Sequence, residues 1–446
     1  MKLNSLVLLG WFIAAIFAGS VEYATGLNQL FWIPYFLGLL LVFLSYARPN
    51  FRASFATIKV QENRQGAEKF IGFLLVLWML VGLFSSIASM NPLLQILVAS
   101  KSYFFMWGLT LAMLLRRWSD VATHRLWSAV VVVAVLQWPA VLYQRLVVVP
   151  RRSDFAAWDA IVGTFGGSPD GGGNSAAMAM VACIATAVVV IRWKGKQLST
   201  KSACLLGLLS LAPGFIAEVK MIFVWIAGLL IVAFVFHARS RPLKALATSL
   251  LVVPLLLGIG IAYKSIFYDA GGTNSWEQIY DQQIKYAIDS DEFSDEHQRL
   301  GRTAALAFWW MQNQNSDPLN LFFGYGLGAS RSASSVAQGE VAKRYPFEID
   351  SSSASRLLWD TGVIGAGLFL VILGSSAWAA MSLAKRQHLT LVGKQSVMLS
   401  GIVFLLTLLS FTYNRDSTDT PAIQLLMAVS LGMILNAAKR PARVGA

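Results

Sequence analysis

A succession of apolar runs, each close to the length of a bilayer crossing, constrains this chain more than any other feature. A membrane-spanning helix needs about 20 mostly apolar residues, and twelve runs reach or approach that length. Their cores are Leu6–Ala18, Leu30–Tyr46, Phe70–Ala88, Tyr103–Leu115, Trp127–Leu146, Ser175–Ile191, Ala203–Ala217, Met221–His237, Leu243–Tyr263, Thr361–Ala384, Ser396–Phe411 and Pro421–Ala437. We therefore expect an all-α polytopic membrane protein with about 12 transmembrane helices.

The composition supports a membrane protein. The chain is 56% hydrophobic and only 13% charged, whereas soluble domains are about 45–50% apolar and about 25% charged. The first run resembles a signal peptide, but no clean small-residue cleavage site follows it, so we expect it to be a membrane helix.

The charges predict an orientation, because basic residues concentrate in cytoplasmic loops. With the N-terminus inside, most of the 36 Lys and Arg residues fall on the cytoplasmic side. Of the 23 acidic residues, only Glu62, Glu68 and Asp120 do. Both termini are then cytoplasmic. The formal net charge of +13 is a signal of topology, and we expect no nucleic-acid partner.

One long polar stretch, Lys264 to Arg356, interrupts the apolar pattern between the ninth and tenth runs. We expect it to form a large external insert of helices. The chain then divides into residues 1–263 with nine membrane helices, the insert 264–356, and residues 357–446 with three more.

Two motifs stand out inside the insert. The sequence predicts a helix that carries Arg299 and Arg302 on its first turns, nearly on one face, and continues past Trp309 to a break at Asn-Ser-Asp-Pro. A G-x-G-x-G sequence follows at Gly324, Gly326 and Gly328. It predicts a sharp turn, because glycine adopts positive φ without strain.

A second external loop, Pro150 to Asn174, precedes the sixth run. It contains Arg151 and Arg152 and the glycine-rich sequence GTFGGSPDGGGN. Two interpretations are open: the glycines bring the backbone close to a ligand, or the loop is only flexible. It is not a Walker-type phosphate loop, because no Gly-Lys-Ser/Thr follows.

The order of these motifs resembles the O-antigen ligase and polymerase superfamily. The resemblance rests on Gly163-Thr164-Phe165, the arginine-led helix from Arg302 to Trp309, the glycine turn, and a polar segment ahead of Gly362. It implies a membrane glycosyltransferase that uses polyprenyl-diphosphate-linked glycans, in the bacterial inner membrane with its active side periplasmic. It also implies no metal and no cofactor, with fixed cations binding the diphosphate. The candidates are Arg302, Lys220, Arg299, Arg356, Arg151 and Arg152, with Lys220 standing where the superfamily has an arginine.

The sequence departs from the superfamily at the expected base. Ligase-type relatives have a His-Asn pair ahead of the glycine equivalent to Gly362, and here Asp350, Ser351 and Ser352 occupy that place. Asp350 is our first candidate for the general base, with Ser351 beside it, and Glu218 is the second. The competing interpretations are structural: Asp350 or Ser351 caps the tenth helix, and Glu218 pairs with Lys220.

The missing histidine favours a polymerase, which joins glycan repeat units, over a ligase, which transfers the glycan to lipid A core or protein. The expected partners are the lipid-linked glycan donor, a glycan acceptor, the lipid bilayer, and a chain-length regulator or flippase. A transporter is the alternative class, since many carriers have twelve helices with both ends inside. No repeat relates the two halves, however, and the charges lie mostly at the ends of the runs.

Overall fold

The computed structural model describes most of the chain. The described residues are 3–46, 66–114, 118–152, 160–167, 174–238, 258, 261, 265, 289–290, 293–294, 299–332, 337–386 and 389–438. The ninth predicted run, Leu243–Tyr263, falls almost entirely outside them, as does most of the insert before Arg299.

The described chain is helical apart from one pair of two-residue strands, β1 (Phe293–Ser294) and β2 (Arg299–Leu300), which run antiparallel. The helices, in order, are α1 (Leu3–Phe12), α2 (Ala18–Thr25), α3 (Trp32–Tyr46), α5 (Gly66–Ala88), α6 (Leu93–Tyr103), α7 (Gly108–Leu114), α8 (Asp120–Val135), α9 (Gln137–Tyr143), α10 (Ser175–Lys194), α11 (Thr200–Ile216), α12 (Met221–Ala238), α16 (Arg302–Asn313), α17 (Pro318–Phe323), α18 (Ser353–Ala384), α19 (Leu391–Leu409), α20 (Asp416–Asp419) and α21 (Pro421–Ala438).

Several helices are long and apolar enough to cross a membrane, as the sequence predicts. Within the described residues there are seven, and eight if α6 and α7, bent by 45° at Phe104, form one span. The seven are Ser5–Thr25, Lys69–Ala88, Asp120–Arg151, Ser175–Lys194, Ser353–Ala384, Leu391–Leu409 and Pro421–Ala438. Shorter apolar helices cover parts of the second, seventh and eighth runs. The chain therefore has the make-up of a multi-pass membrane protein, and the figure of twelve spans stays a prediction.

Helix α21 lies at the centre of the bundle. Within its 18 residues, Pro421–Ala438, 89% are buried inside the protein. The helix packs against α7, α18 and α19. Helix α18 contacts α5 and α19, while α10 contacts α8 and α11. Outward-facing helices expose apolar side chains such as Phe73 and Trp378, as expected for surfaces in contact with lipid.

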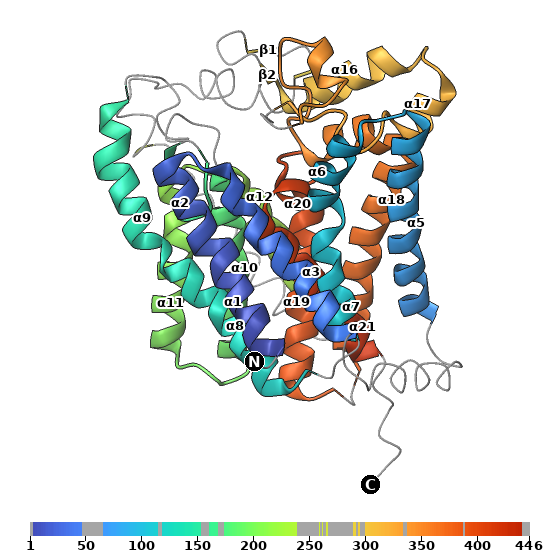
Figure 1. The fold of residues 1–446 in the computed structure, drawn as a ribbon. Helices are drawn as coiled ribbons and strands as arrows, with labels where there is room; N and C mark the ends of the chain where they lie inside the picture. The colour runs from blue at the N-terminus through green and yellow to red at the C-terminus, as the bar shows by residue number, and fades with distance from the viewer. Residues whose placement is uncertain are drawn as a thin grey trace.

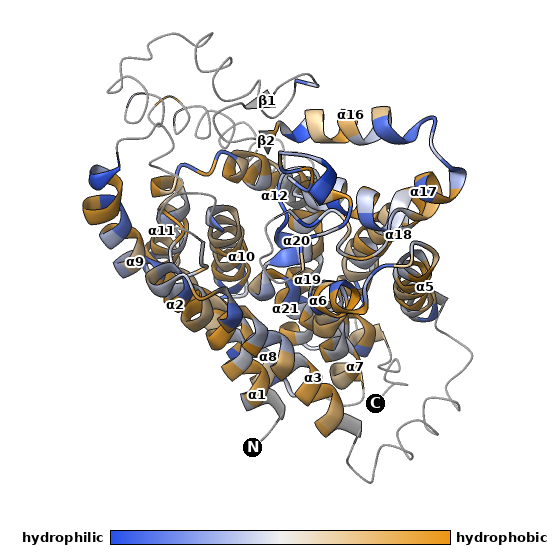
Figure 2. Cartoon of the chain, turned by 45° about the horizontal axis from the view of Figure 1, so that its top comes forward, coloured by the Kyte–Doolittle hydropathy of each residue, from blue (hydrophilic) through white to orange (hydrophobic). Residues whose placement is uncertain are grey.

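The described part of the insert lies over one end of the bundle. Figure 1 shows α16 and α17 across this end, with α20 and the upper part of α6 below them, whereas α1 begins and α21 ends at the opposite end. In Figure 2 the hydrophilic colours gather around α20 and at the ends of α16, and the bundle helices are mainly hydrophobic.

One predicted boundary is wrong, and two helices begin before the cores predicted from the sequence. Helix α6 begins at Leu93, ten residues before the predicted core that starts at Tyr103, and its Gln95, Lys101 and Ser102 are buried. The tenth helix begins at Ser353 and is interrupted at Gly362. Arg299 does not share a helix with Arg302: Arg299 pairs with Ser294 in the strand pair, and α16 starts only after the extended Gly301. The side chain of Arg299 lies outside the described residues.

Candidate functional site

The glycine turn packs directly on an interruption in α18. Gly362 has φ 64° and ψ −169°, which breaks the helix. The carbonyls of Trp359 and Asp360 then accept hydrogen bonds from the N–H groups of Tyr325 (2.8 Å) and Gly326 (2.9 Å). A side chain at Gly324 would lie 2.6 Å from the backbone of α18. The predicted turn at Gly324, Gly326 and Gly328 is present, with positive φ at all three glycines.

The side chain of Asp360 fixes the next part of this turn. Its carboxylate accepts hydrogen bonds from the N–H groups of Gly328 (2.8 Å) and Ser330 (2.9 Å) and from the hydroxyl of Tyr103 (2.7 Å). A fully buried carboxylate needs such donors. Asp360 thereby ties the glycine turn to α18 and α6, and it sets the position of Arg331, the residue after Ser330.

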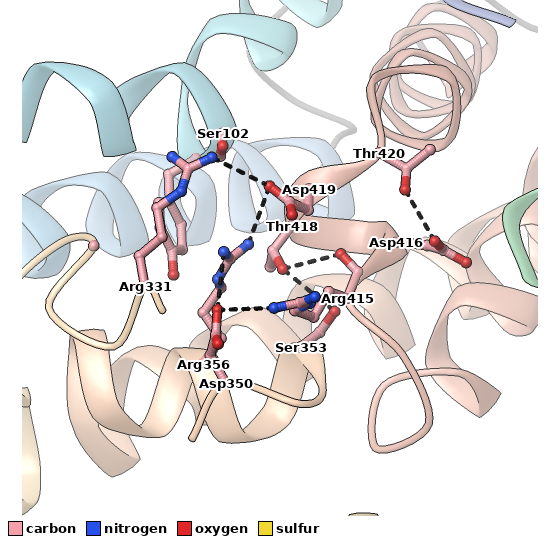
Figure 3. Close-up of polar contacts among 12 residues, drawn as sticks. Ser102, Arg331, Asp350, Ser353, Arg356, Arg415, Asp416, Thr418, Asp419 and Thr420 are labelled. Atoms are coloured by element: carbon pink, nitrogen blue, oxygen red, sulfur yellow. Dashed lines mark hydrogen bonds and ion pairs between the residues drawn. The ribbon is translucent and has the colours of Figure 1, made fainter. Parts of the chain in front are cut away.

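Five charged side chains meet beside this turn, and we call them the arginine cluster. Its members are Arg331 after the glycine turn, Asp350 before α18, Arg356 in the first turn of α18, Arg415 after α19 and Asp419 at the end of α20. Figure 3 shows Arg331 and Arg356 directed at Asp419, and Arg356 and Arg415 directed at Asp350.

Distances in the arginine cluster are those of close ion pairs. Asp350 Oδ2 lies 3.1 Å from Arg356 Nη2 and 3.2 Å from Arg415 Nη1. Asp419 Oδ1 lies 3.3 Å from Arg356 Nη1 and 3.8 Å from Arg331 Nη2. Asp350 is completely buried, but 35% of the Asp419 side chain is exposed. The cluster therefore has a closed side at Asp350 and an accessible side at Asp419.

The arginine cluster carries more positive than negative charge. Three arginines face two aspartates, and Glu348 Oε2 lies 3.9 Å from Arg415 Nη1 at the edge of the cluster. Burial alone would raise the pKa of Asp419, but the guanidinium groups, first that of Arg356 and then that of Arg331, hold it below its usual range. Asp419 is therefore ionised. Lys101 and Arg302 lie close by, so among the described residues the cations here outnumber the carboxylates paired with them. Such an excess suits an anionic ligand.

A further cation, Lys101 on α6, lies close to the arginine cluster. Its side chain is buried, with Nζ 4.8 Å from the Trp32 ring and 5.1 Å from the Tyr35 ring, both from α3. The Tyr35 hydroxyl donates to the backbone carbonyl of Asp419 (3.0 Å), and the Lys101 charge acts on the Asp419 carboxylate. The aromatic faces hold the ammonium group by cation–π attraction.

Arg302 begins α16 and reaches back to the segment before α18. Its Nη1 donates to the backbone carbonyl of Ser351 (2.5 Å), and its guanidinium lies 5.1 Å from the Tyr413 ring. Trp309, farther along α16, is buried against Trp359 and Ile349. The predicted arginine-led helix is thus present from Arg302 onward, and it places this arginine next to the residues that precede Arg356.

The segment Asp350–Ser352 is buried, and its cap differs from the one considered from the sequence. Ser352 is the N-cap of α18 and exchanges hydrogen bonds with Ser355 in a capping box. Neither Asp350 nor Ser351 caps the helix. The Asp350 carboxylate pairs with both Arg356 and Arg415 and can hold the two guanidinium groups in place. A role of Asp350 as the general base stays a prediction.

The second predicted site, Glu218 to Lys220, lies between α11 and α12. Glu218 has φ 55° and lies 4.0 Å from Arg145, on the helix that precedes the glycine-rich loop. Trp225, in the second turn of α12, donates to the Ser410 hydroxyl (2.8 Å) at the end of α19. The start of α12, where half-buried Lys220 lies, is therefore at the same end of the bundle as Arg415.

The Gly163-Thr164-Phe165 motif is packed, so the flexible-loop interpretation is wrong for this part of the loop. The Gln144 side chain accepts from the Gly163 N–H (2.8 Å), and Gln137 accepts from the Thr164 N–H (2.8 Å). The Thr164 hydroxyl donates to the Ala15 carbonyl in the first span (2.6 Å). Residues 168–173 lie outside the described residues.

Arg151 is the last residue of the long helical span Asp120–Arg151, and Arg152 follows it. Arg151 is exposed and Arg152 is half-buried. Substrate binding by Arg151 and Arg152 stays a prediction, and so does substrate binding by Lys220 and Arg299.

Sequence reasoning missed most members of the arginine cluster. Arg415 and Asp419 lie in Arg-Asp-Ser-Thr-Asp, a short polar link between two apolar runs, and Lys101 and Asp360 each lie just before an apolar run. Ionisable residues are costly at the edges of membrane helices and are commonly functional there. Their positions in the sequence could therefore have indicated a site. Arg331 had no signal, because only the folded glycine turn brings it to Asp419.

Comparison with known proteins adds no family. No family model matches the chain, and no curated protein matches it.

Proposed function

We propose that this chain is a membrane glycosyltransferase that polymerises polyprenyl-diphosphate-linked glycan repeat units. The observation that carries the proposal is the arginine cluster, an excess of fixed positive charge at one end of an apolar helical bundle. In the cell this end would face the periplasm, with both termini in the cytoplasm.

The chemistry of the proposed reaction needs such a site. Transfer of a glycan from its carrier makes the diphosphate a leaving group, and negative charge develops on its oxygens. Guanidinium groups match pairs of phosphate oxygens and stay charged at any relevant pH. Arg331 and Lys101 lie at the accessible side of the cluster, and Arg302 lies beside Ser351, just before α18. Because salt bridges and hydrogen bonds already hold them in place, they can stabilise the leaving group without rearranging.

The surroundings suit a lipid-linked substrate. The arginine cluster lies where α18, α19 and α21 end or begin, so a diphosphate bound there would place its isoprenoid chain along apolar helices. The glycan would then extend toward α16 and α17. The ligase reaction differs only in the acceptor, and the experiment below distinguishes the two.

The test is growth of the glycan in a purified system. The protein in lipid receives the polyprenyl-diphosphate-linked repeat unit as the only sugar substrate, and mass spectrometry measures the product lengths. We expect longer lipid-linked glycans from the wild type. We expect a rate loss of about 10²–10³-fold in Arg331→Ala and in Arg302→Ala, the magnitude typical of a lost charge-stabilising contact.

Arg344→Ala is the matched control. Arg344 also belongs to the insert and lies over an aromatic ring, Tyr325, at 5.7 Å, but it is exposed and outside the arginine cluster. It should keep the wild-type rate. No growth with the native repeat unit, followed by transfer once lipid A core is supplied, would replace the polymerase with a ligase. Failure of both reactions would overturn the proposal.

A further inference from the structure

Within the described part of the chain, the carboxylates nearest the arginine cluster are poorly placed to take a proton from an acceptor hydroxyl. Asp350, Asp419, Glu348 and Glu218 each lie within 4.0 Å of an arginine. Asp360 and Asp416 are buried and accept hydrogen bonds from neighbouring groups. A carboxylate that acts as a general base must be within reach of the substrate hydroxyl, and its charge must not already be neutralised by a cation.

Glu22, near the end of α2, meets both conditions. Its side chain is partly exposed. The hydrogen bond that the described residues give it comes from the Gly167 N–H, which donates to Oε2 at 2.8 Å. No cation lies within ion-pair distance of Glu22 among the described residues.

The glycine-rich loop holds Glu22 in place. Gly166 leaves room for the carboxylate, because a side chain there would overlap Oε2. Gly19, one turn earlier on α2, lies against the backbone of Thr164 and Phe165 so closely that a side chain would overlap it. Gln137 and Gln144 hold the loop by hydrogen bonds to its backbone. The Glu22 carboxylate therefore has a defined position. Pre-positioning of this kind is what proton transfer at a site requires.

Glu22 also lies near the accessible side of the arginine cluster. The charges of Glu22 and Asp419 are close enough to repel one another. Helix α3 follows α2 after a short turn, and its Tyr35 donates to the Asp419 backbone. The glycine-rich loop, Glu22 and the exposed edge of Asp419 are thus brought to one end of the bundle by the first three helices.

We propose that Glu22 is the general base that activates the acceptor hydroxyl. The inference rests on the proposed function. The hydroxyl oxygen attacks the anomeric carbon of the donor as its proton passes to the Glu22 carboxylate. The bond from that carbon to the diphosphate breaks, and the diphosphate leaves with the electron pair beside Arg331 and Arg356. The packed Gly163–Gly167 segment has the role of positioning this base.

The decisive variant is Glu22→Gln. Its amide oxygen can still accept from the Gly167 N–H, so the loop contact survives while the proton acceptor is lost. We expect kcat for chain growth to fall by about 10²–10⁴-fold, the usual contribution of a general base. Binding of the lipid-linked donor, measured separately, should stay within about twofold of wild type, since the cations are intact. Glu22→Asp, which keeps a shorter carboxylate, should recover part of the rate.

Thr25→Ala is the matched control. Thr25 lies one turn away on α2. Its hydroxyl donates to the Val21 carbonyl and accepts from the Leu27 N–H, both local contacts, so this variant should keep the wild-type rate. A Glu22→Gln protein that elongates glycans at more than a third of the wild-type rate would overturn the inference and leave the polymerase standing. Absence of growth in the wild type itself would instead overturn the proposed function.

Discussion

At the scale of single residues, burial and pairing decide what each charged group can do. Asp350 is completely buried between Arg356 and Arg415 and holds both guanidinium groups in place. Asp416 is also buried. Burial raises its pKa to about 7, against the hydrogen bond from Thr420. The pKa of Asp419, in contrast, is held below its usual range by Arg356 and Arg331. The pKa values of these two aspartates, three residues apart, are therefore shifted in opposite directions.

Loss of Asp350 should destabilise the fold. Asp350→Ala leaves two arginines without this partner, and removal of one member of a buried ion pair costs about 3–5 kcal/mol. Thermal unfolding followed by tryptophan fluorescence should show a large decrease in Tm. Glu340→Ala, which removes a carboxylate from the exposed pair with Lys343, is the control and should leave Tm nearly unchanged. A stable Asp350→Ala protein that has lost all chain growth would instead favour Asp350 as the base.

The sequence alone located individual residues of the site but not their partners. Asp350, Arg356 and Arg302 could be selected because they lie near recognisable motifs. Asp350 and Arg356, which pair with each other, are close in the chain. The other contacts join distant segments: Arg356 with Asp419, Asp350 with Arg415, and Arg302 with Ser351. No spacing rule predicts such pairs, because helix periodicity relates only residues three or four apart.

At the scale of elements, the interruption of α18 at Gly362 organises the site. It releases the carbonyls of Trp359 and Asp360 to the glycine turn, which in turn positions Arg331. The sequence predicted the apolar part of this helix and the glycine turn separately. It could not show that they contact one another, because hydropathy gives the length of a helix and not its neighbours.

Gly362→Ala tests this arrangement. A side chain at Gly362 would overlap the backbone of Phe322, and φ is +64°, so we expect a loss of stability of about 1–3 kcal/mol together with slower chain growth. Gly374→Ala, on the same helix but with nothing within 4 Å of the added carbon, should be neutral or slightly stabilising. Equal Tm values for the two variants would show that the glycine turn does not depend on the kink.

At the scale of the whole molecule, the fold separates an apolar bundle from one polar end. Most of the bundle could be predicted, because runs of apolar residues have few alternatives in a membrane. The polar end could not, since α16, α17, α20 and the glycine-rich loop come together through tertiary contacts. Two groups of residues meet there: the cations around Asp419 and the carboxylate of Glu22. The proposed transfer reaction, with its charged leaving group, would use both groups.

The most direct test of the account compares bond formation with release of the leaving group in one reaction. Free polyprenyl diphosphate and added repeat units are counted in the same sample, with lipid-linked repeat unit as the only substrate. We predict one polyprenyl diphosphate released for each repeat unit added, and neither product in Glu22→Gln or Arg331→Ala beyond a trace. Release of polyprenyl diphosphate without chain growth, or growth unaffected by both substitutions, would contradict the account.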